Sequence, residues 1–528
     1  MEPTEAEERI LRRLTRTRKL FAFLRLHRHE IFDDGFQDEL AEMYRDTGAG
    51  EEPRPPALMC LALLLQGYVQ ASDAEAPELS VMDARWQLVL GCLGATKPAF
   101  SQGGLQQFRE RLIAHDMDRR LLERTIEVAK RSRGFDWKKL PKDLRVGMDS
   151  RPLEGAGRVE DTYNLLGHAA RKLLEGAANL TGQSQERICM AAGIRLLLAP
   201  SIKAGLDIDW SDPEQKAHAI DRLTHEIDAL VDWIETKQPS IATDETVEPY
   251  ITAIHQVEEQ DLEKTAQGTV QIRQGVAEDR RVSIEDAEMR HGRKSKSKRY
   301  NGYKEHVAAD LSAGLILACA LTPANVPDEE AAPALKADID RQDASIGELM
   351  IDRAYLNSEA VNAVEDEGGE VVCKPWPTRN NTGDLFTKTD FVINGRDKTI
   401  TCPAGEVESF DWGQVVEFDP DACGSCALRG QCTRSTSGRG RLVKIAEDER
   451  RQKRLRKLQS SRAGRQRLRR RTGIEHHLAH VAQRKGRRAR YRGARKNLYD
   501  LRRASAIQNL ETIQRKQAAW TAARKEAA

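Results

Sequence analysis

The sequence has no apolar run long enough to cross a membrane. Its longest run, from Leu58 to Val69, is shorter than the roughly 20 residues that span a bilayer, and it contains Gln66. The first residues, MEPTEAEERILRRLTRTRK, lack the apolar core of a signal peptide. We therefore expect a protein of the cytoplasm with no membrane partner.

Motifs of several enzyme classes are also missing. There is no GxxxxGK[ST] phosphate loop, so ATP dependence is not expected. The histidines and aspartates have no spacing typical of a zinc hydrolase, and no internal repeat is evident. Cysteine is sparse until residue 402, and five of the nine cysteines have apolar neighbours that predict burial in the core: Cys60, Cys92, Cys189, Cys319 and Cys373.

Acidic residues are nearly absent from one basic segment. Between Arg451 and Arg503 there are 21 lysines and arginines but only Glu475 and Asp500 as acids, although the net charge of the chain is +2. Such a segment on an otherwise acidic protein is typical of a polyanion partner. A solvated, self-repelling helix is the alternative, but apolar residues interrupt the segment in a regular pattern, which favours nucleic acid.

The order of predicted elements indicates a mixed α/β sheet. LRVGMD, ending at Asp149, is followed by a long helical stretch, by two alternating strands around Tyr303–Ala309 and Leu315–Leu321, and by the strands ELMID and VVCKP. A helix is predicted between each pair of the last three strands, and Asp328 is the expected cap of the first of these helices. Residues 379–445 are rich in Gly and Asp and predicted to be poor in β-structure.

Two aspartates follow predicted strands. Asp149 ends LRVGMD and Asp352 ends ELMID. Polar residues at the carboxyl ends of strands line the functional crevice of an open α/β sheet, and carboxylate oxygens are the ligands that Mg²⁺ prefers. Glu475, on a helix with Ile474 and Leu478 facing the core, is a candidate third ligand. It could instead simply pair with Arg471 one turn earlier.

Four segments resemble the motifs of bacterial insertion-sequence transposases of the DDE type. They are VGMDSRPLEGAGRVEDTYNLL, the long block from Asp286 to Asp328 that contains GYKEHVAADLSAG and TPANVPD, LMIDRAYLN, and the RxxxE run at 471–475. The resemblance implies a ribonuclease H-like catalytic core in which Asp149, Asp352 and Glu475 hold Mg²⁺ or Mn²⁺. Two such ions would support cleavage of DNA at the element ends and joining to target DNA. The resemblance also implies a bacterial, nucleoid-associated protein, and by analogy a homodimer would bind the paired ends.

The sequence departs from the family pattern at one position. Related transposases often carry a lysine seven residues after the glutamate, where this chain has Ala482; Arg484 or Lys485 could substitute. Glu365, Glu367 and Glu370 compete with Glu475 for the role of third acid. Arg151, two residues after Asp149, would displace a metal if it pointed at that carboxylate. A nuclease that cuts without joining and an inactive DNA-binding relative are therefore alternative interpretations.

The remaining cysteines form one cluster, C-x20-C-x2-C-x5-C. Four thiolates in a loop-rich segment are typical of a structural Zn²⁺ site, and similar cysteines in this transposase subgroup favour zinc over chance clustering. The ligands would be Cys402, Cys423, Cys426 and Cys432.

Basic residues near the site are candidate DNA contacts. HGRKSKSKRY at 291–300 is either a phosphate-binding loop or a solvated one, and Tyr300 and Tyr303 could stack on an unpaired base. The full set of candidate contacts is Arg293, Lys294, Lys296, Lys298, Lys304, Arg471, Lys485, Arg488 and Arg492.

These expectations divide the chain into five parts. They are a helical DNA-binding domain (1–135), a ribonuclease H-like core (140–160 and 270–378), a helical insertion (161–268), a cysteine-rich insertion (379–445) and a basic helical segment that completes the core (446–528). The first part would suit a helix-turn-helix reader or a plain bundle equally well.

Overall fold

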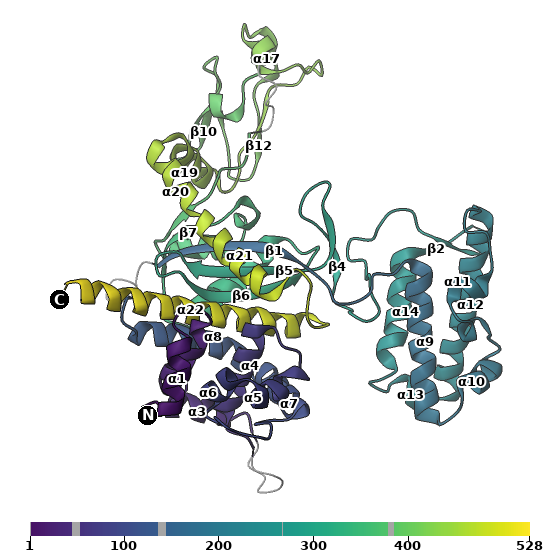
Figure 1. The fold of residues 1–528 in the computed structure, drawn as a ribbon. Coiled ribbons are helices and arrows are strands. Elements are labelled where there is room, and N and C mark those ends of the chain that lie inside the picture. The colour runs from purple at the N-terminus through teal and green to yellow at the C-terminus, as the bar shows by residue number, and fades with distance from the viewer. Residues whose placement is uncertain (1, 45–52, 136–143, 267, 379–384, 528) are drawn as a thin grey trace.

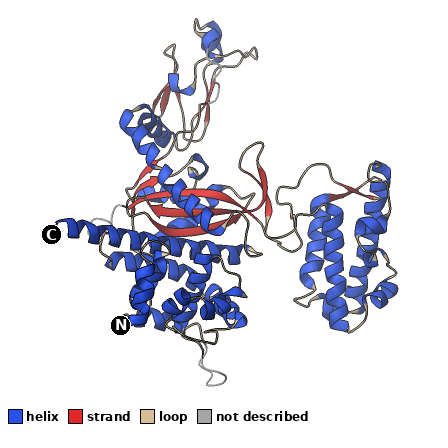
Figure 2. Cartoon of the chain, viewed as in Figure 1, coloured by secondary structure: helices blue, strands red, loops and turns tan. Residues whose placement is uncertain are grey.

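A computed structural model describes residues 2–44, 53–135, 144–266, 268–378 and 385–527. Figures 1 and 2 show a central mixed sheet, a helical domain below it, a helical bundle to one side and a small lobe with short strands above. Among the described residues, no helix is long and apolar enough to cross a membrane.

The central sheet contains both antiparallel and parallel strands. Its order is β6–β5–β1–β7–β8, and the short β4 pairs with the start of β5. β5 is antiparallel to β1, β4 and β6, whereas β7 runs parallel to β1 and β8 runs parallel to β7. The strand bounds are β1 Leu144–Glu154, β4 Arg290–Arg293, β5 Arg299–Asp310, β6 Leu315–Pro323, β7 Ile346–Met350 and β8 Glu370–Val372. This mixed sheet with helices is consistent with a ribonuclease H-like core.

The N-terminal domain is helical throughout its described residues. Its helices are α1 Glu5–Arg13, α2 Lys19–Ile31, α3 Asp34–Ala41, α4 Pro56–Val69, α5 Glu75–Met82, α6 Ala84–Leu90, α7 Gln102–Ala114 and α8 Met117–Arg131. The long C-terminal helix α22 (Ala494–Ala527) lies between this domain and the sheet and packs on α8, α4 and β6. As a result, one continuous hydrophobic core joins the N-terminal helices to the sheet.

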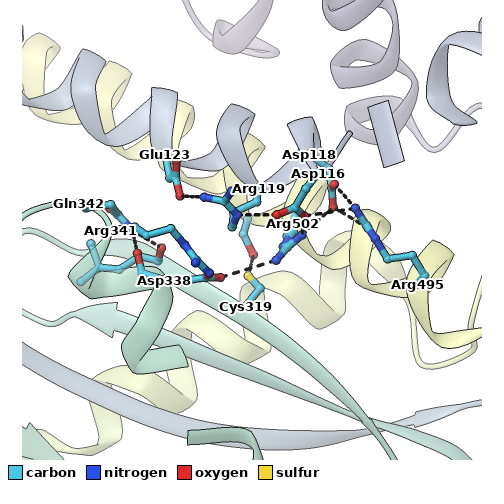
Figure 3. A network of polar contacts seen from close by, with 12 residues as sticks. Asp116, Asp118, Arg119, Glu123, Cys319, Asp338, Arg341, Gln342, Arg495 and Arg502 are labelled. Carbon is cyan, nitrogen blue, oxygen red and sulfur yellow. Dashed lines mark hydrogen bonds and ion pairs between the residues drawn. The ribbon is translucent and has the colours of Figure 1, made fainter. Parts of the chain in front are cut away.

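Charged side chains reinforce the contact between the N-terminal domain and the core (Figure 3). Arg502 of α22 contacts Asp116 at 2.6 Å and Asp118 at 3.2 Å, and its other terminal nitrogen lies 3.6 Å from Asp338. Asp338 belongs to α15 (Ala332–Asp340), which packs on β6. One buried arginine thus links three parts of the chain that lie far apart in the sequence.

The helical insertion between β1 and β5 forms a bundle with its own hydrophobic core. Figure 1 shows it beside the sheet rather than on it. Its helices are α9 Thr162–Thr181, α10 Gln185–Ala192, η1 Leu196–Leu198, α11 Ile202–Leu206, α12 Pro213–Lys237, α13 Pro239–Ala242 and α14 Glu248–Asp261. A hairpin of β2 (Leu262–Lys264) and β3 (Val270–Ile272) follows.

The cysteine-rich lobe contains more strands than the sequence predicts. β9 Val392–Asn394, β10 Thr399–Thr401 and β11 Val407–Ser409 form one sheet, and β12 Val415–Glu417 and β13 Leu442–Lys444 form another. The lobe also has two short helices, α17 Pro420–Ser425 and α18 Arg429–Cys432. They contain Cys423 and Cys432, and Cys426 directly follows α17. The expectation of a β-poor segment was wrong because these strands are only three residues long, which is too short for a recognisable pattern in the sequence.

Three helices lead from this lobe back to the sheet. They are α19 Glu449–Ser460, α20 Arg462–Arg470 and α21 Thr472–Lys485. α21 packs on β1 through Ile474, Leu478 and Val481, which are all buried. Gly147 permits this close approach, since a Cβ atom there would lie 3.0 Å from the Cβ of Ile474.

Two local expectations need correction. β1 does not end at Asp149, because residues 150–154 continue to pair with β5. Asp328 is not a helix cap: Pro327 precedes the short helix η2 (Asp328–Ala331) without a side-chain cap, and the Asp328 carboxylate is bound elsewhere.

Candidate active site

The register of β1 and β7 brings Asp149 and Asp352 together. Gly147 pairs with Met350 in the parallel ladder, and each aspartate lies two residues further along its chain. The Asp149 carboxylate is largely buried and accepts a hydrogen bond from the Ser150 amide at 2.8 Å. The Asp352 carboxylate accepts one from the Ala354 amide at 2.9 Å, which caps η3 (Arg353–Tyr355).

The two carboxylates influence each other's charge. Burial raises the pKa of Asp352 above its ordinary value, and the negative charge of Asp149 raises it further. Burial also raises the pKa of Asp149, while the nearby Arg471 guanidinium opposes that shift. Two buried acids that repel each other are stabilised by a cation between them, which is the property a metal site needs.

Glu475 reaches the same site through Arg471. Arg471 donates to Asp149 at 2.8 Å and to Glu475 at 2.5 Å, so one guanidinium bridges the two acids. The structure therefore contains the intrahelical Arg471–Glu475 pair, and it also brings Glu475 to the aspartates. Among the described residues, no three His, Cys, Asp or Glu side chains are arranged to hold a metal ion. Arg471 supplies the positive charge between these carboxylates.

Arg151 does not point at Asp149. Its guanidinium pairs with the buried Glu305 and donates to the Gly486 carbonyl at 3.1 Å. Lys485 contacts Glu305 at 2.6 Å and Asp500 at 3.1 Å and is almost fully buried. These charges fix the end of α21 against β1, β5 and α22.

Asp328 is an acid that the sequence argument assigned no role at the site. Its carboxylate accepts hydrogen bonds from Ser150 Oγ and from Lys304 Nζ, both at 2.6 Å, and its charge contributes to the raised pKa of Asp352. The signal that could have found it is its place at the end of the long transposase-like block.

The competing glutamates have other partners. Glu365 pairs with Arg451 and Arg454. Glu370 pairs with Arg467, and Glu367 pairs with Lys336.

Apart from Arg471, which contacts Asp149 and Glu475, the candidate DNA contacts fall into three groups. Arg293, Lys294, Lys296 and Lys298 are exposed on the β4–β5 hairpin. Arg488, whose Nη2 lies 3.4 Å from the Ala156 carbonyl, and Arg492, paired with Glu285 at 2.9 Å, lie near the surface after α21. Lys304 and Lys485 instead turn inward to carboxylates, so in this structure they do not face solvent.

The tyrosines of the basic stretch are not available to stack on a base. Tyr300 and Tyr303 are buried, and the Tyr303 hydroxyl donates to Asp286 at 2.5 Å.

The four clustered cysteines lie close together. Cys402, Cys423, Cys426 and Cys432 line one cavity at the end of the lobe. Burial raises the pKa of Cys432, as do the charges of the other three thiols. The donors that zinc prefers are thus gathered, although not in the arrangement of a metal site.

Residues 269–510 match the family model described as a transposase DDE domain. The chain contains a transposase DDE domain. The matched segment includes Asp352 and Glu475, while Asp149 precedes it and joins it through the β1–β7 register. Searches of curated proteins and of solved structures gave no match.

Proposed function

We propose that the protein is a DNA transposase that cuts DNA at the ends of an insertion sequence and joins those ends to target DNA. The proposal rests on the match of residues 269–510 to a transposase DDE domain. It is supported by Arg471, which contacts both Asp149 and Glu475, and by the charge of Asp149, which raises the pKa of Asp352. The alternatives, a nuclease that does not join and an inactive relative, become outcomes of the experiment below.

The donor set fits divalent ions. Asp149, Asp352 and Glu475 would hold Mg²⁺ or Mn²⁺, and carboxylate oxygens suit both. Bound ions would activate the attacking oxygen and stabilise the leaving oxygen of a phosphodiester. Because Arg471 already neutralises Asp149 and Glu475, we expect metal ions to compete with it for these carboxylates, freeing its guanidinium for a DNA phosphate.

DNA would contact the exposed β4–β5 hairpin beside this site. The cations at its tip would bind phosphates without reading sequence. The N-terminal domain would recognise the element ends, and a homodimer would hold two ends in the bacterial cytoplasm.

We also propose a structural zinc ion at the four clustered cysteines. Reduced, purified protein should contain one zinc per chain by elemental analysis, and Cys423→Ser with Cys426→Ser should lose it. Zinc-free wild type would overturn this proposal without affecting the catalytic one.

The test of the main proposal is an assay with labelled DNA that flanks the protein's own gene. With Mg²⁺ or Mn²⁺ we expect discrete cuts and joined products, and with EDTA neither. Cuts without joining would identify a nuclease. Binding without cuts would identify an inactive DNA-binding protein.

A further inference from the structure

A strongly basic groove lies away from the candidate active site. It runs between the cysteine-rich lobe and α19. Five cations line it, with one tryptophan in its wall: Lys388, Arg396, Arg450, Lys453, Arg456 and Trp412. We call this surface the lobe groove.

The positive charge of the lobe groove is largely uncompensated. Its single acid, Glu449, is 4% exposed and is already paired with Lys388 and with Arg456, the latter at 3.1 Å. Arg396, Arg450 and Lys453 are exposed and make no ion pair within the described part of the chain. The buried Nε of Arg456 also has no hydrogen-bond partner there. Unpaired cations on one concave surface favour an anionic ligand.

Trp412 holds one of these cations in place. The Arg450 guanidinium lies over its ring at 5.1 Å and donates to the Gly395 carbonyl at 3.1 Å. The same ring packs edge-on against Phe410 at 5.1 Å. Because Arg450 covers the ring, the groove presents fixed charge rather than an open stacking surface, which suits a sugar-phosphate backbone.

The lobe groove is connected to the active site by further cations. α19 continues into α20, where Arg462, Arg469 and Arg470 are exposed and without ion pairs in the described residues. The next residue is Arg471, which contacts Asp149. Figure 1 shows α19 and α20 between the lobe and α21. The cations therefore follow a path from the lobe to the candidate site.

We propose that the lobe groove binds the backbone of duplex DNA that extends beyond the cleavage site. This inference rests on the proposed function, because it assumes that DNA occupies the site beside Glu475. It assigns the cysteine-rich lobe a direct role in holding DNA.

The experiment measures the affinity of the full-length protein for a labelled duplex by fluorescence anisotropy over a range of salt concentrations. Arg396→Gln with Lys453→Gln should lower the slope of log affinity against log salt by about 2, since each phosphate contact contributes about 0.9. At about 0.1 M salt this corresponds to roughly 10- to 100-fold weaker binding. Truncating the duplex near the cut should remove the difference between variant and wild type.

The matched control is Lys237→Gln with Lys398→Gln, two exposed lysines that do not line the groove. This control should keep the wild-type slope. If the groove variant also keeps that slope while its melting temperature is unchanged, the inference is overturned and the proposed function stands. If wild type binds no DNA, the proposed function itself fails.

Discussion

Replacing Lys485 by methionine tests whether buried charge holds the Glu475 helix on the sheet. Lys485 is the last residue of α21, and its ammonium contacts Glu305 on β5 and Asp500 on α22. Methionine keeps much of the volume but removes the charge between two buried carboxylates. Each carboxylate keeps one other cation: Arg151 pairs with Glu305, and Arg503 lies 2.5 Å from Asp500.

The magnitude follows from these partners. Breaking a buried ion pair by removing one member costs about 3–5 kcal/mol. Because both acids retain an arginine, we expect the lower end, about 3 kcal/mol. A loss of that size makes local opening about 100-fold more frequent. Backbone amides of α21 and α22 should therefore exchange hydrogen about 100-fold faster under native conditions.

Hydrogen exchange read by mass spectrometry checks this prediction. The control is Lys398→Met, since Lys398 pairs with Asp411 on the surface with both side chains more than half exposed. Such a pair is worth about 0–1 kcal/mol, so exchange should change little. If Lys485→Met raises exchange in α21 less than threefold, this network does not anchor the helix.

Three further predictions concern other parts of the chain. Arg25→Met removes the cation that lowers the pKa of Glu7 from 4.5 to about 2. Wild type should be more stable than this variant by up to roughly 3 kcal/mol above pH 4.5, and it should lose this advantage as the pH falls toward 2. The difference between their melting temperatures should therefore shrink between pH 7 and pH 3. Gly302→Ala should lower the free energy of unfolding, measured with denaturant, by about 2 kcal/mol or more, because φ of Gly302 is +146° and a Cβ atom would lie 2.3 Å from the Leu153 carbonyl oxygen. A loss below about 0.5 kcal/mol would contradict this. Mg²⁺ should raise the melting temperature of Arg471→Ala more than it raises that of wild type. An equal or smaller rise would show that Arg471 does not compete with metal ions.

The sequence predicted the central sheet because its strands have strong local patterns. Tyr303–Ala309 and Leu315–Leu321 alternate or are uniformly apolar, and both fall within strands of the structure. The end of β1 was missed because residues 150–154 include Arg151 and Pro152, and only their pairing with β5 makes them a strand. Long-range pairing of this kind leaves little local signal.

The candidate site was predictable only in part. The strand positions of Asp149 and Asp352 indicated that they meet. Nothing local showed that Arg471 would contact Asp149, 322 positions away, and so link it to Glu475. Lys304 and Lys485 have the charge of DNA contacts, yet both face carboxylates that come from distant strands and helices. Charge can be counted in a sequence, whereas its partners depend on the tertiary fold.

The proposed function requires that Asp149, Asp352 and Glu475 together cut DNA with divalent metal. The most direct measurement compares cleavage by Asp149→Asn, Asp352→Asn and Glu475→Gln with wild type, after confirming that each variant binds the same DNA. Glu370→Gln is the matched control, because Glu370 was a competing third acid and pairs with Arg467 instead. We predict that only wild type and the control cut. If Glu475→Gln cuts like wild type, or Glu370→Gln does not cut, the assignment of the third acid is contradicted.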